Sequence, residues 1–237
     1  MGNSHKLDGL VKWAQRPEWR EAFMMSFALH LAKACEEADV EVDDVPEMIG
    51  EDAFAMLWGC SFEDLIARTT EDGRNIADDY LKRRSWKESA ASRAYITAVR
   101  GSTMSVYEMT DFAADGSFLA RDLVRGGEAL RVVETSVNGD LSQWDRLGGR
   151  LVNIQGRIIL TGGVLPFDHD EADEVIAAIR AALDKPREEP KGLALKLSLP
   201  VDETTPAMSR EEILASIPCM LSYVWLRNRL ADELDPP

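Results

Sequence analysis

The stretch MSVYEMTDF at residues 104–112 opens a block of short apolar runs that closes with GGVLPF at 162–167. Ten of the sixteen glycines of the chain lie between Gly101 and Gly163, most of them where one apolar run gives way to the next. The hydrophobic period inside the block is near 2, which is typical of half-buried strands. The sequence therefore predicts a compact β-module within the chain.

Five strands are expected in this module, with tight turns at RGG 125–127, QG 155–156 and LGG 147–149. Because an open sheet of short strands leaves two unpaired edges, a small closed or half-closed antiparallel barrel is the expected form. The predicted strands are 104–112, 117–124, 128–134, 149–154 and 157–161. Alternation is expected to turn Leu119, Leu123, Val132, Val152 and Ile158 toward the interior.

Helical periodicity precedes the module. Residues 17–38 are predicted as an amphipathic helix with Pro17 in its first turn. A second helix is expected to begin after Asp43 or Asp44 and to be interrupted at Gly59. A short helix opened by Ser61 and Asp64 and a long helix over 75–99 complete the expected N-terminal region.

Helices also follow the module. The acids at 168–170 suit the positive end of a helix dipole, and Ser209 with Glu212 forms a capping box for a last helix that Pro218 kinks or restarts. Between these helices, alternating leucines at 193–199 predict one further strand. The expected fold class is α+β, with a helical region at 1–101, the β-module at 102–167 and a third region at 168–237 that packs on the other two.

The charge of the chain is segregated along the sequence. Its net charge is −15; residues 36–79 hold fifteen acidic residues against two basic ones, giving −13, and residues 80–100 hold six basic against one acidic, giving +5. A negative field of this size disfavours nucleic acid as a partner. Two interpretations stay open: a solvated surface in which the basic stretch pairs with the acidic one, or a contact surface for a basic partner.

Three separated cysteines, Cys35, Cys60 and Cys219, lie among apolar neighbours, which favours buried thiols over a disulfide framework. No secretion signal and no apolar run of membrane-spanning length is found. We therefore expect a cytoplasmic protein without a membrane partner.

The central segment resembles a module of uncharacterised bacterial proteins that often carry the small zinc-binding motif known from the C-terminus of the SecA translocase. The residues that carry this resemblance are 105–108, 116–119, RDL 121–123, Gly127, Val132, WDR 144–146, RLV 150–152 and GGVLPF 162–167. The resemblance implies a shared fold and no assigned reaction. Because that zinc motif needs clustered cysteines and this chain has none close together in sequence, no zinc site and no cofactor is predicted from it.

Two charged pairs and an aromatic residue are candidate ligand or partner contacts of the module: Arg121 with Asp122, Asp145 with Arg146, and Trp144. A rim site for an anion and a structural ion pair are both open for the charged pairs. Trp144 is expected either to pack against the barrel end or to offer a stacking face.

Asp168, His169 and Asp170 form the alternative candidate, because an imidazole flanked by two carboxylates is a possible metal or base site. Helix capping by the aspartates is the competing interpretation. His30, on a strongly apolar helix, is predicted to be a satisfied core histidine.

No catalytic motif of high specificity is present, and whether the chain catalyses a reaction stays open at this point. The favoured hypothesis is a non-catalytic binding protein that uses the β-module to contact another protein or a small ligand. A metal-assisted hydrolase at 168–170 is the alternative, and nucleic-acid binding through the basic stretch at 82–100 is a weaker one.

Overall fold

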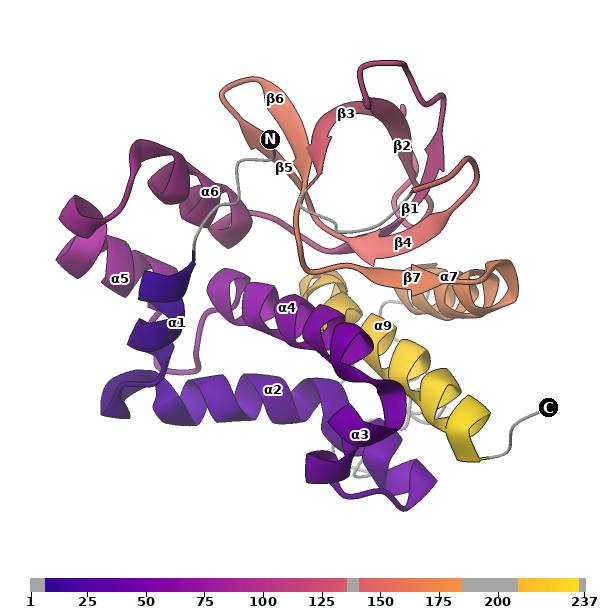
Figure 1. Cartoon of the computed structure of the whole chain (residues 1–237), viewed down its shortest axis with the longest axis horizontal. Helices are drawn as coiled ribbons and strands as arrows, with labels where there is room; N and C mark the ends of the chain where they lie inside the picture. Colours follow the sequence, from indigo (N-terminus) through magenta and orange to yellow (C-terminus); the bar gives the residue numbers. More distant parts are fainter. Residues whose placement is uncertain (1–6, 136–140, 185–208, 235–237) are drawn as a thin grey trace.

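The computed structural model describes residues 7–135, 141–184 and 209–234. A curled sheet forms the middle of the chain and helices lie at both ends of it, so the predicted α+β class is confirmed. In Figure 1 the curled sheet lies above a helical layer that includes α4 and α9, with α2 farther from the sheet. The helices of the described part are α1 (Asp8–Ala14), α2 (Pro17–Ala38), α3 (Val45–Ile49), α4 (Glu51–Ala67), α5 (Ile76–Arg84), α6 (Ala90–Arg100), α7 (His169–Asp184) and α9 (Arg210–Leu234), with two 3₁₀ turns, η1 (Val42–Asp44) and η2 (Ser85–Lys87).

Helix α2 has the bounds that the sequence predicts. Pro17 stands at its first position, where a missing N–H costs nothing. The helix ends at Asp39, which adopts a left-handed conformation with φ of 55° and donates its N–H to carbonyls of the last turn.

Two predictions about the segment that forms helix α4 are wrong. The break falls at Gly50, whose φ is +84°, and the helix then runs without interruption through Gly59. The backbone of Gly163 lies beside Gly59: a Cβ at Gly59 would be 3.5 Å from Gly163 Cα. The segment that begins at Ser61 is therefore the end of α4 and not a separate helix, and all residues from 60 to 66 are buried.

The single helix predicted for 75–99 is also wrong, because the chain turns at η2 and restarts. Asn75 caps α5 by accepting a hydrogen bond from Asp78 N at 3.0 Å, and Ser89 caps α6 by accepting one from Ser92 N at 3.0 Å. A second cap within the predicted helix explains the break, since Ser at an N-cap competes with continued helix.

The sheet has seven strands in the order β5-β6-β3-β2-β1-β4-β7 and curls into a half-barrel. Its strands are β1 (Ser105–Thr110), β2 (Phe118–Asp122), β3 (Leu130–Thr135), β4 (Arg146–Gly149), β5 (Leu151–Ile154), β6 (Arg157–Leu160) and β7 (Leu165–Phe167). Most neighbouring strands are antiparallel as predicted, but β3 and β6 are parallel. Strands β4 and β5 are separated by Arg150 alone, although they lie near opposite ends of the sheet order. Residues 146–154 therefore cross the open side of the curl.

Strand β7 and most of β4 lie outside the five predicted strands, which include only Gly149 of β4. The LGG run at 147–149 is part of β4 and not a turn, because Gly148 and Gly149 leave room for neighbouring side chains: a Cβ at Gly148 would lie 3.0 Å from Phe167 and 3.2 Å from Leu221. The glycines thus permit close packing of β4 on β7 and α9.

On β2, the residues that face the interior of the half-barrel are one position away from the predicted one. Phe118 and Ala120 are buried and Leu119 between them is half-buried, so the predicted inward position of Leu119 is wrong. Val132 lies inside the half-barrel as predicted, and the half-buried Ile158 packs against the cluster that fills it. Val152 is buried against the helices instead, and the half-buried Leu123 packs on the cluster around α9. The cluster that fills the half-barrel consists of Tyr107, Met109, Phe118, Ala120, Val132, Leu147, Leu160 and Val164.

Helix α4 separates two further hydrophobic clusters. Leu57 and Cys60 belong to a cluster with α2, α7, α9 and β7, and Phe62 and Ile66 belong to one with α1, α5 and α6. Strand residues enter both clusters, Leu165 the first and Val152 the second. The predicted division into three regions stays a prediction, and the strand predicted at 193–199 lies outside the described residues.

Helix α9 starts as predicted. Glu212 N donates to Ser209 Oγ at 3.2 Å and Ser209 N donates to Glu212 Oε2 at 2.6 Å, which completes the capping box. Pro218 lies inside this helix. Among the helices described, none has the length and apolar character needed to span a bilayer.

Candidate functional site

Two adjacent acids, Glu63 and Asp64, lie on the buried half of α4, each only 4% exposed. Buried carboxylates need charged or hydrogen-bonding partners. Because neighbouring helix positions point about 100° apart, the two side chains reach different surroundings. Each is the centre of its own polar cluster.

Asp64 lies among three cationic side chains. Arg68, one turn later on α4, donates to Oδ2 from Nε at 3.1 Å and from Nη2 at 2.7 Å. Arg150, at the bend between β4 and β5, donates from Nη2 to Oδ1 at 3.2 Å. Burial alone raises the pKa of Asp64, but hydrogen bonding to His30 and the charges of Arg68, His30 and Arg150 outweigh it and lower the pKa to about 2.

His30 of α2 provides the third cation and is 1% exposed. Its Nε2 lies 3.3 Å from Asp64 Oδ2 and its Nδ1 lies 2.6 Å from Ser222 Oγ on α9. Burial disfavours the charged imidazole, yet hydrogen bonding to Asp64 and to the thiols of Cys219 and Cys60 raises the pKa of His30 well above its usual value. The prediction of a core histidine with satisfied partners agrees with this geometry.

Glu63 forms the second cluster. Its carboxylate accepts hydrogen bonds from Thr161 Oγ1 at 2.6 Å, from Tyr95 Oη at 3.1 Å and from Gly163 N at 3.1 Å. Burial raises the pKa of Glu63, and these donors together with the charge of Arg150 oppose that shift. Glu63 therefore fixes α6 and the β6–β7 loop on α4.

A pocket of about 150 Å³ opens beside the Asp64 cluster, between the start of β1, the end of α4 and the first turns of α9. Arg68 and Arg150 line it together with Asp64. Arg150 also donates from Nη1 to the carbonyl of Ser102 at 3.2 Å, which holds the guanidinium against the pocket wall. The remaining lining residues are Ala67, Ser102, Thr103, Met104, Leu214, Ala215 and Pro218.

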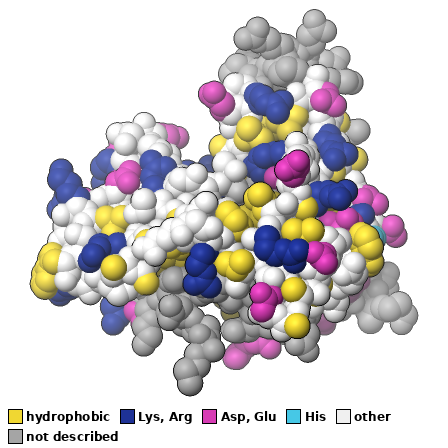
Figure 2. All heavy atoms as spheres, turned by 90° about the horizontal axis from the view of Figure 1, so that it is seen from above, with side chains coloured by type: hydrophobic (Ala, Val, Ile, Leu, Met, Phe, Trp, Pro, Cys, Tyr) yellow, Lys and Arg dark blue, Asp and Glu magenta, His cyan; other side chains and the backbone are white. Residues whose placement is uncertain are grey.

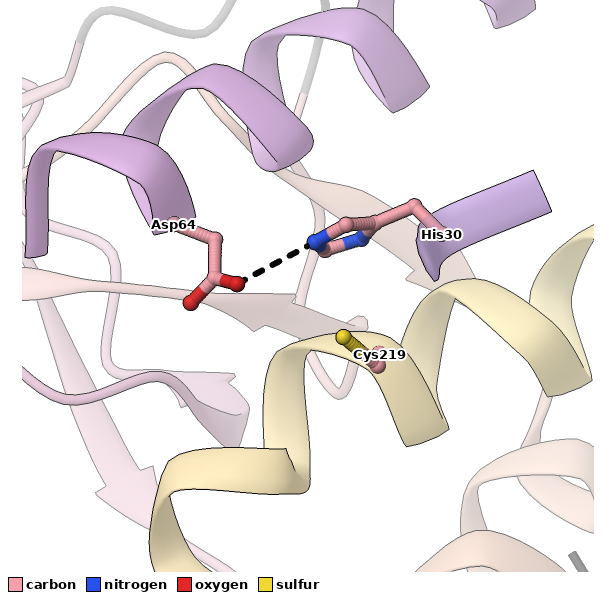
Figure 3. Close-up of side chains that lie close together, drawn as sticks. All are labelled: His30, Asp64 and Cys219. Atoms are coloured by element: carbon pink, nitrogen blue, oxygen red, sulfur yellow. Dashed lines mark hydrogen bonds and ion pairs between the residues drawn. The ribbon is translucent and has the colours of Figure 1, made fainter. Parts of the chain in front are cut away.

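Three donor atoms of different chemistry meet at the same cluster. Figure 3 shows His30 and Asp64 pointing toward one another from α2 and α4, with Cys219 of α9 beside them. The imidazole nitrogen, carboxylate oxygen and Cys219 Sγ all lie within 4.8 Å of one another. Arg68 Nη2 lies 3.6 Å from the same Sγ.

The residues predicted as module contacts lie elsewhere. Arg146 on β4 is half-buried and bonds Glu108 of β1 at 3.3 Å and Asp173 of α7 at 2.6 Å, so it links the sheet to α7. Arg121 is exposed on β2, directly opposite Glu108 in the register. These arginines form a row on the outer surface of the sheet with Glu108 between them.

The two aspartates predicted as ligand or partner contacts of the module accept hydrogen bonds from nearby backbone N–H groups. Asp122 Oδ1 accepts from Ser105 Oγ at 2.6 Å and from the backbone N–H groups of Val124 and Arg125, and Asp145 Oδ2 accepts from Ser142 N at 2.7 Å. Trp144 is 54% exposed and its φ is +74°.

Asp168 caps α7. Asp168 Oδ1 accepts from Glu171 N at 2.7 Å while Glu171 Oε2 accepts from Asp168 N at 3.0 Å. His169 and Asp170 are exposed. Within the described residues the group with the spacing of metal ligands is His30, Asp64 and Cys219, and none of the three predicted residues belongs to it.

The basic stretch at 82–100 is partly paired with the acidic one, as one interpretation of the sequence expects. Arg83 bonds Asp79 at 2.7 Å and Arg100 bonds Asp78 at 3.2 Å. Figure 2 shows Lys and Arg interspersed with Asp and Glu on the face seen from above. That face carries no continuous block of one sign.

Sequence reasoning missed Asp64, Arg68, Arg150 and Cys219 as a cluster. One local signal was available: the acids of FEDLI at 62–66 stand inside an apolar run of a helix, where a solvated acid is not expected. Arg150 and Cys219 carry no such signal, because Arg150 is 86 residues from Asp64 and Cys219 is 151 residues from Arg68 along the chain.

Comparison of the chain with protein-family models, with curated proteins and with solved structures finds no match. The resemblance of the central segment to the bacterial proteins with the SecA-type zinc motif therefore stays a prediction. The site must be interpreted from its own geometry.

Proposed function

We propose that the protein is a binding protein whose pocket beside Asp64 takes a small anion, a phosphate or a carboxylate, between the β-module and the helices. The observation that supports this proposal is the excess of positive charge around Asp64, which lines the pocket together with Arg68 and Arg150. Arg68, Arg150 and His30 surround the single carboxylate of Asp64. In the adjacent acid, Glu63, burial favours the neutral form.

The pocket also offers donors that the fold does not consume. Within the described part of the chain, Arg68 Nη1 has no hydrogen-bond partner, and the Arg68 side chain is 35% exposed. Thr103 also lines the pocket. Arginine is suited to anions because its planar fork matches two oxygens at once.

The size of the pocket sets the size of the ligand. A cavity of about 150 Å³ takes a molecule of roughly benzene size, about six non-hydrogen atoms. Inorganic phosphate and short carboxylates fall in this range. Larger ligands would have to extend over the exposed residues at the entrance.

This proposal places the expected binding function of the β-module at one pocket, which Arg150 and residues 102–104 of the module form together with α4 and α9. The metal-assisted hydrolase at 168–170 gains no support, because Asp168 serves as a helix cap. Nucleic-acid binding by the basic stretch gains none either, because Arg83 and Arg100 are engaged with acids.

Thermal unfolding with and without phosphate, acetate or succinate tests the proposal. Ligand binding at about 100 times Kd stabilises a protein by about 2.7 kcal/mol, so the wild-type Tm is expected to rise with at least one of these anions. The variant Arg68→Gln is expected to lose this rise. Arg83→Gln, which removes an arginine paired outside the pocket, is the matched control and is expected to keep it.

Two outcomes would overturn the proposal. One is the absence of any anion-dependent rise in the wild-type protein at concentrations up to tens of millimolar. The other is an equal rise in all three proteins, which would indicate general salt effects and not a pocket.

A further inference from the structure

We propose that His30, Asp64 and Cys219 form a binding site for a borderline-soft divalent cation such as Zn²⁺. The three side chains come from α2, α4 and α9, and they supply the nitrogen, oxygen and sulfur ligands that zinc accepts in proteins. This inference does not depend on the proposed anion binding. It concerns Asp64 Oδ2, the oxygen that contacts His30, and needs no ligand in the pocket.

The spacing of the donor atoms approaches that of a tetrahedral zinc site. Zinc bonds of about 2.0–2.3 Å place neighbouring ligand atoms roughly 3.3–3.8 Å apart. His30 Nε2 and Asp64 Oδ2 are already 3.3 Å apart, and Cys219 Sγ lies within 4.8 Å of both ligand groups. A shift of the half-buried Cys219 side chain by about 1 Å would bring all three ligand atoms to the spacing of a zinc site.

Arg68 marks the position of the cation. Its Nη2 lies 2.7 Å from Asp64 Oδ2 and 3.6 Å from Cys219 Sγ, so one positive group already stands between two of the three proposed ligands. The Arg68 side chain is 35% exposed and attached near the end of α4, which lets it swing outward when a metal enters. A metal and the Arg68 guanidinium therefore compete for the same carboxylate oxygen.

The charge of the cluster allows a metal ion to replace the Arg68 guanidinium at Asp64. A divalent ion adds two charges, and its binding releases one proton from His30 Nε2 and one from the Cys219 thiol, since both ligands must be deprotonated to coordinate. The cluster therefore keeps its net charge when Arg68 stays in place and loses one positive charge when Arg68 moves out. Arg150 remains paired with the other oxygen of Asp64.

The groups that orient metal ligands in proteins are also present. His30 Nδ1 lies 2.6 Å from Ser222 Oγ, which fixes the plane of the imidazole, and Arg150 holds Asp64 Oδ1 at 3.2 Å. Ligating histidines and carboxylates generally need such outer partners. With three protein ligands, the fourth position would be open to water or to an exogenous donor.

Titration of the full-length protein with Co²⁺, a spectroscopic substitute for Zn²⁺, tests the site. Coordination by Cys219 is expected to give a sulfur-to-cobalt charge-transfer absorption, and stoichiometric Zn²⁺ is expected to abolish it by displacement. Cys219→Ser should remove the band, and His30→Gln should weaken binding at least tenfold. Cys35→Ser and His169→Gln are the matched controls and should leave the band unchanged.

Arg68→Gln separates this inference from the proposed function. Removal of the competing guanidinium is expected to tighten metal binding several-fold, whereas the same change is expected to weaken anion binding. Because His30→Gln removes a buried hydrogen-bonding group and could unfold the chain, a wild-type measurement is also needed: Zn²⁺ should slow alkylation of Cys219, mapped by mass spectrometry.

The site is refuted if the wild-type protein shows no charge-transfer band with Co²⁺ and no zinc protection of Cys219. It is equally refuted if Cys219→Ser folds and retains the band, since the sulfur would then come from another residue. A band lost in Cys60→Ser but kept in Cys219→Ser would assign the sulfur ligand to Cys60 and contradict the proposal.

Discussion

Arg150 and Asp64 form an ion pair of 3.2 Å between side chains that are 2% and 5% exposed. Arg150 stands at the bend where the chain passes from β4 to β5, and Asp64 stands on α4, 86 residues earlier. This buried ion pair is one of the contacts that join the half-barrel to the helical layer. The pocket and the proposed metal ligands both lie around it.

Replacing Arg150 with Gln is expected to destabilise the protein by about 3–5 kcal/mol, because it removes the buried cation on Asp64 Oδ1, whereas His30 and Arg68 both contact Oδ2. Urea unfolding monitored by circular dichroism measures this change. The control Arg83→Gln removes a pair in which the arginine is 63% exposed and should cost no more than about 1 kcal/mol. Similar losses for the two variants would show that the Arg150 pair does not hold the layers together.

Acid should weaken the protein through Asp64. The pKa of Asp64 in the folded state is about 2, below its model-compound value of 3.8, so its ionised form stabilises the fold above pH 4 and this contribution is lost as the pH falls toward 2. The shift corresponds to about 2 kcal/mol.

The measurement compares the free energy of unfolding of wild type and Asp64→Asn between pH 5 and pH 2. The stability advantage of the wild-type protein should shrink by about 2 kcal/mol over this range, while contributions of other acids cancel in the difference. An advantage that stays constant with pH would contradict the buried ion cluster.

Features that neighbouring residues determine were predictable from the sequence, and features that distant residues determine were not. The bounds of α2 and the capping box of α9 follow from Pro17 and from Ser209 with Glu212, which act within one turn. The strand character of Gly148 depends instead on Phe167 and Leu221, which fill the space that a side chain would occupy. No local pattern contains that information.

The candidate site shows the same limit. The sequence rightly placed His30 in the core, and it excluded a zinc site of the SecA type because no two cysteines are close along the chain. Proximity along the chain is not proximity in the fold: Cys219 and Asp64 are brought to His30 by the packing of α9 and α4 on α2. Only the tertiary structure makes these three residues neighbours.

Gly163→Ala should destabilise the protein by about 1–3 kcal/mol, the usual cost of overpacking. A Cβ at Gly163 would lie 2.8 Å from the carbonyl oxygen of Gly59 and 2.8 Å from Glu63 Oε2. The loop before β7 would have to move away from α4, and the hydrogen bond from Gly163 N to Glu63 would lengthen.

Thermal unfolding measures this loss against a control glycine with space around it. At Gly101 a Cβ would lie 3.9 Å from the nearest atoms and φ is −93°, so Gly101→Ala should leave Tm unchanged or slightly higher. Equal Tm values for both variants would show that the contact between α4 and the loop is not tight.

The backbone of Trp144 is strained, because its φ of +74° lies in the left-handed region that bulky residues avoid. Glycine relieves this strain and alanine does not, so Trp144→Gly should be more stable than Trp144→Ala by about 1 kcal/mol. Comparing these two variants removes the effect of losing the indole, which is common to both. At Arg121, an exposed residue of β2, the order should reverse, because glycine weakens an extended strand. Chemical unfolding of the four variants tests the prediction, and the same order at both positions would rule out backbone strain at Trp144.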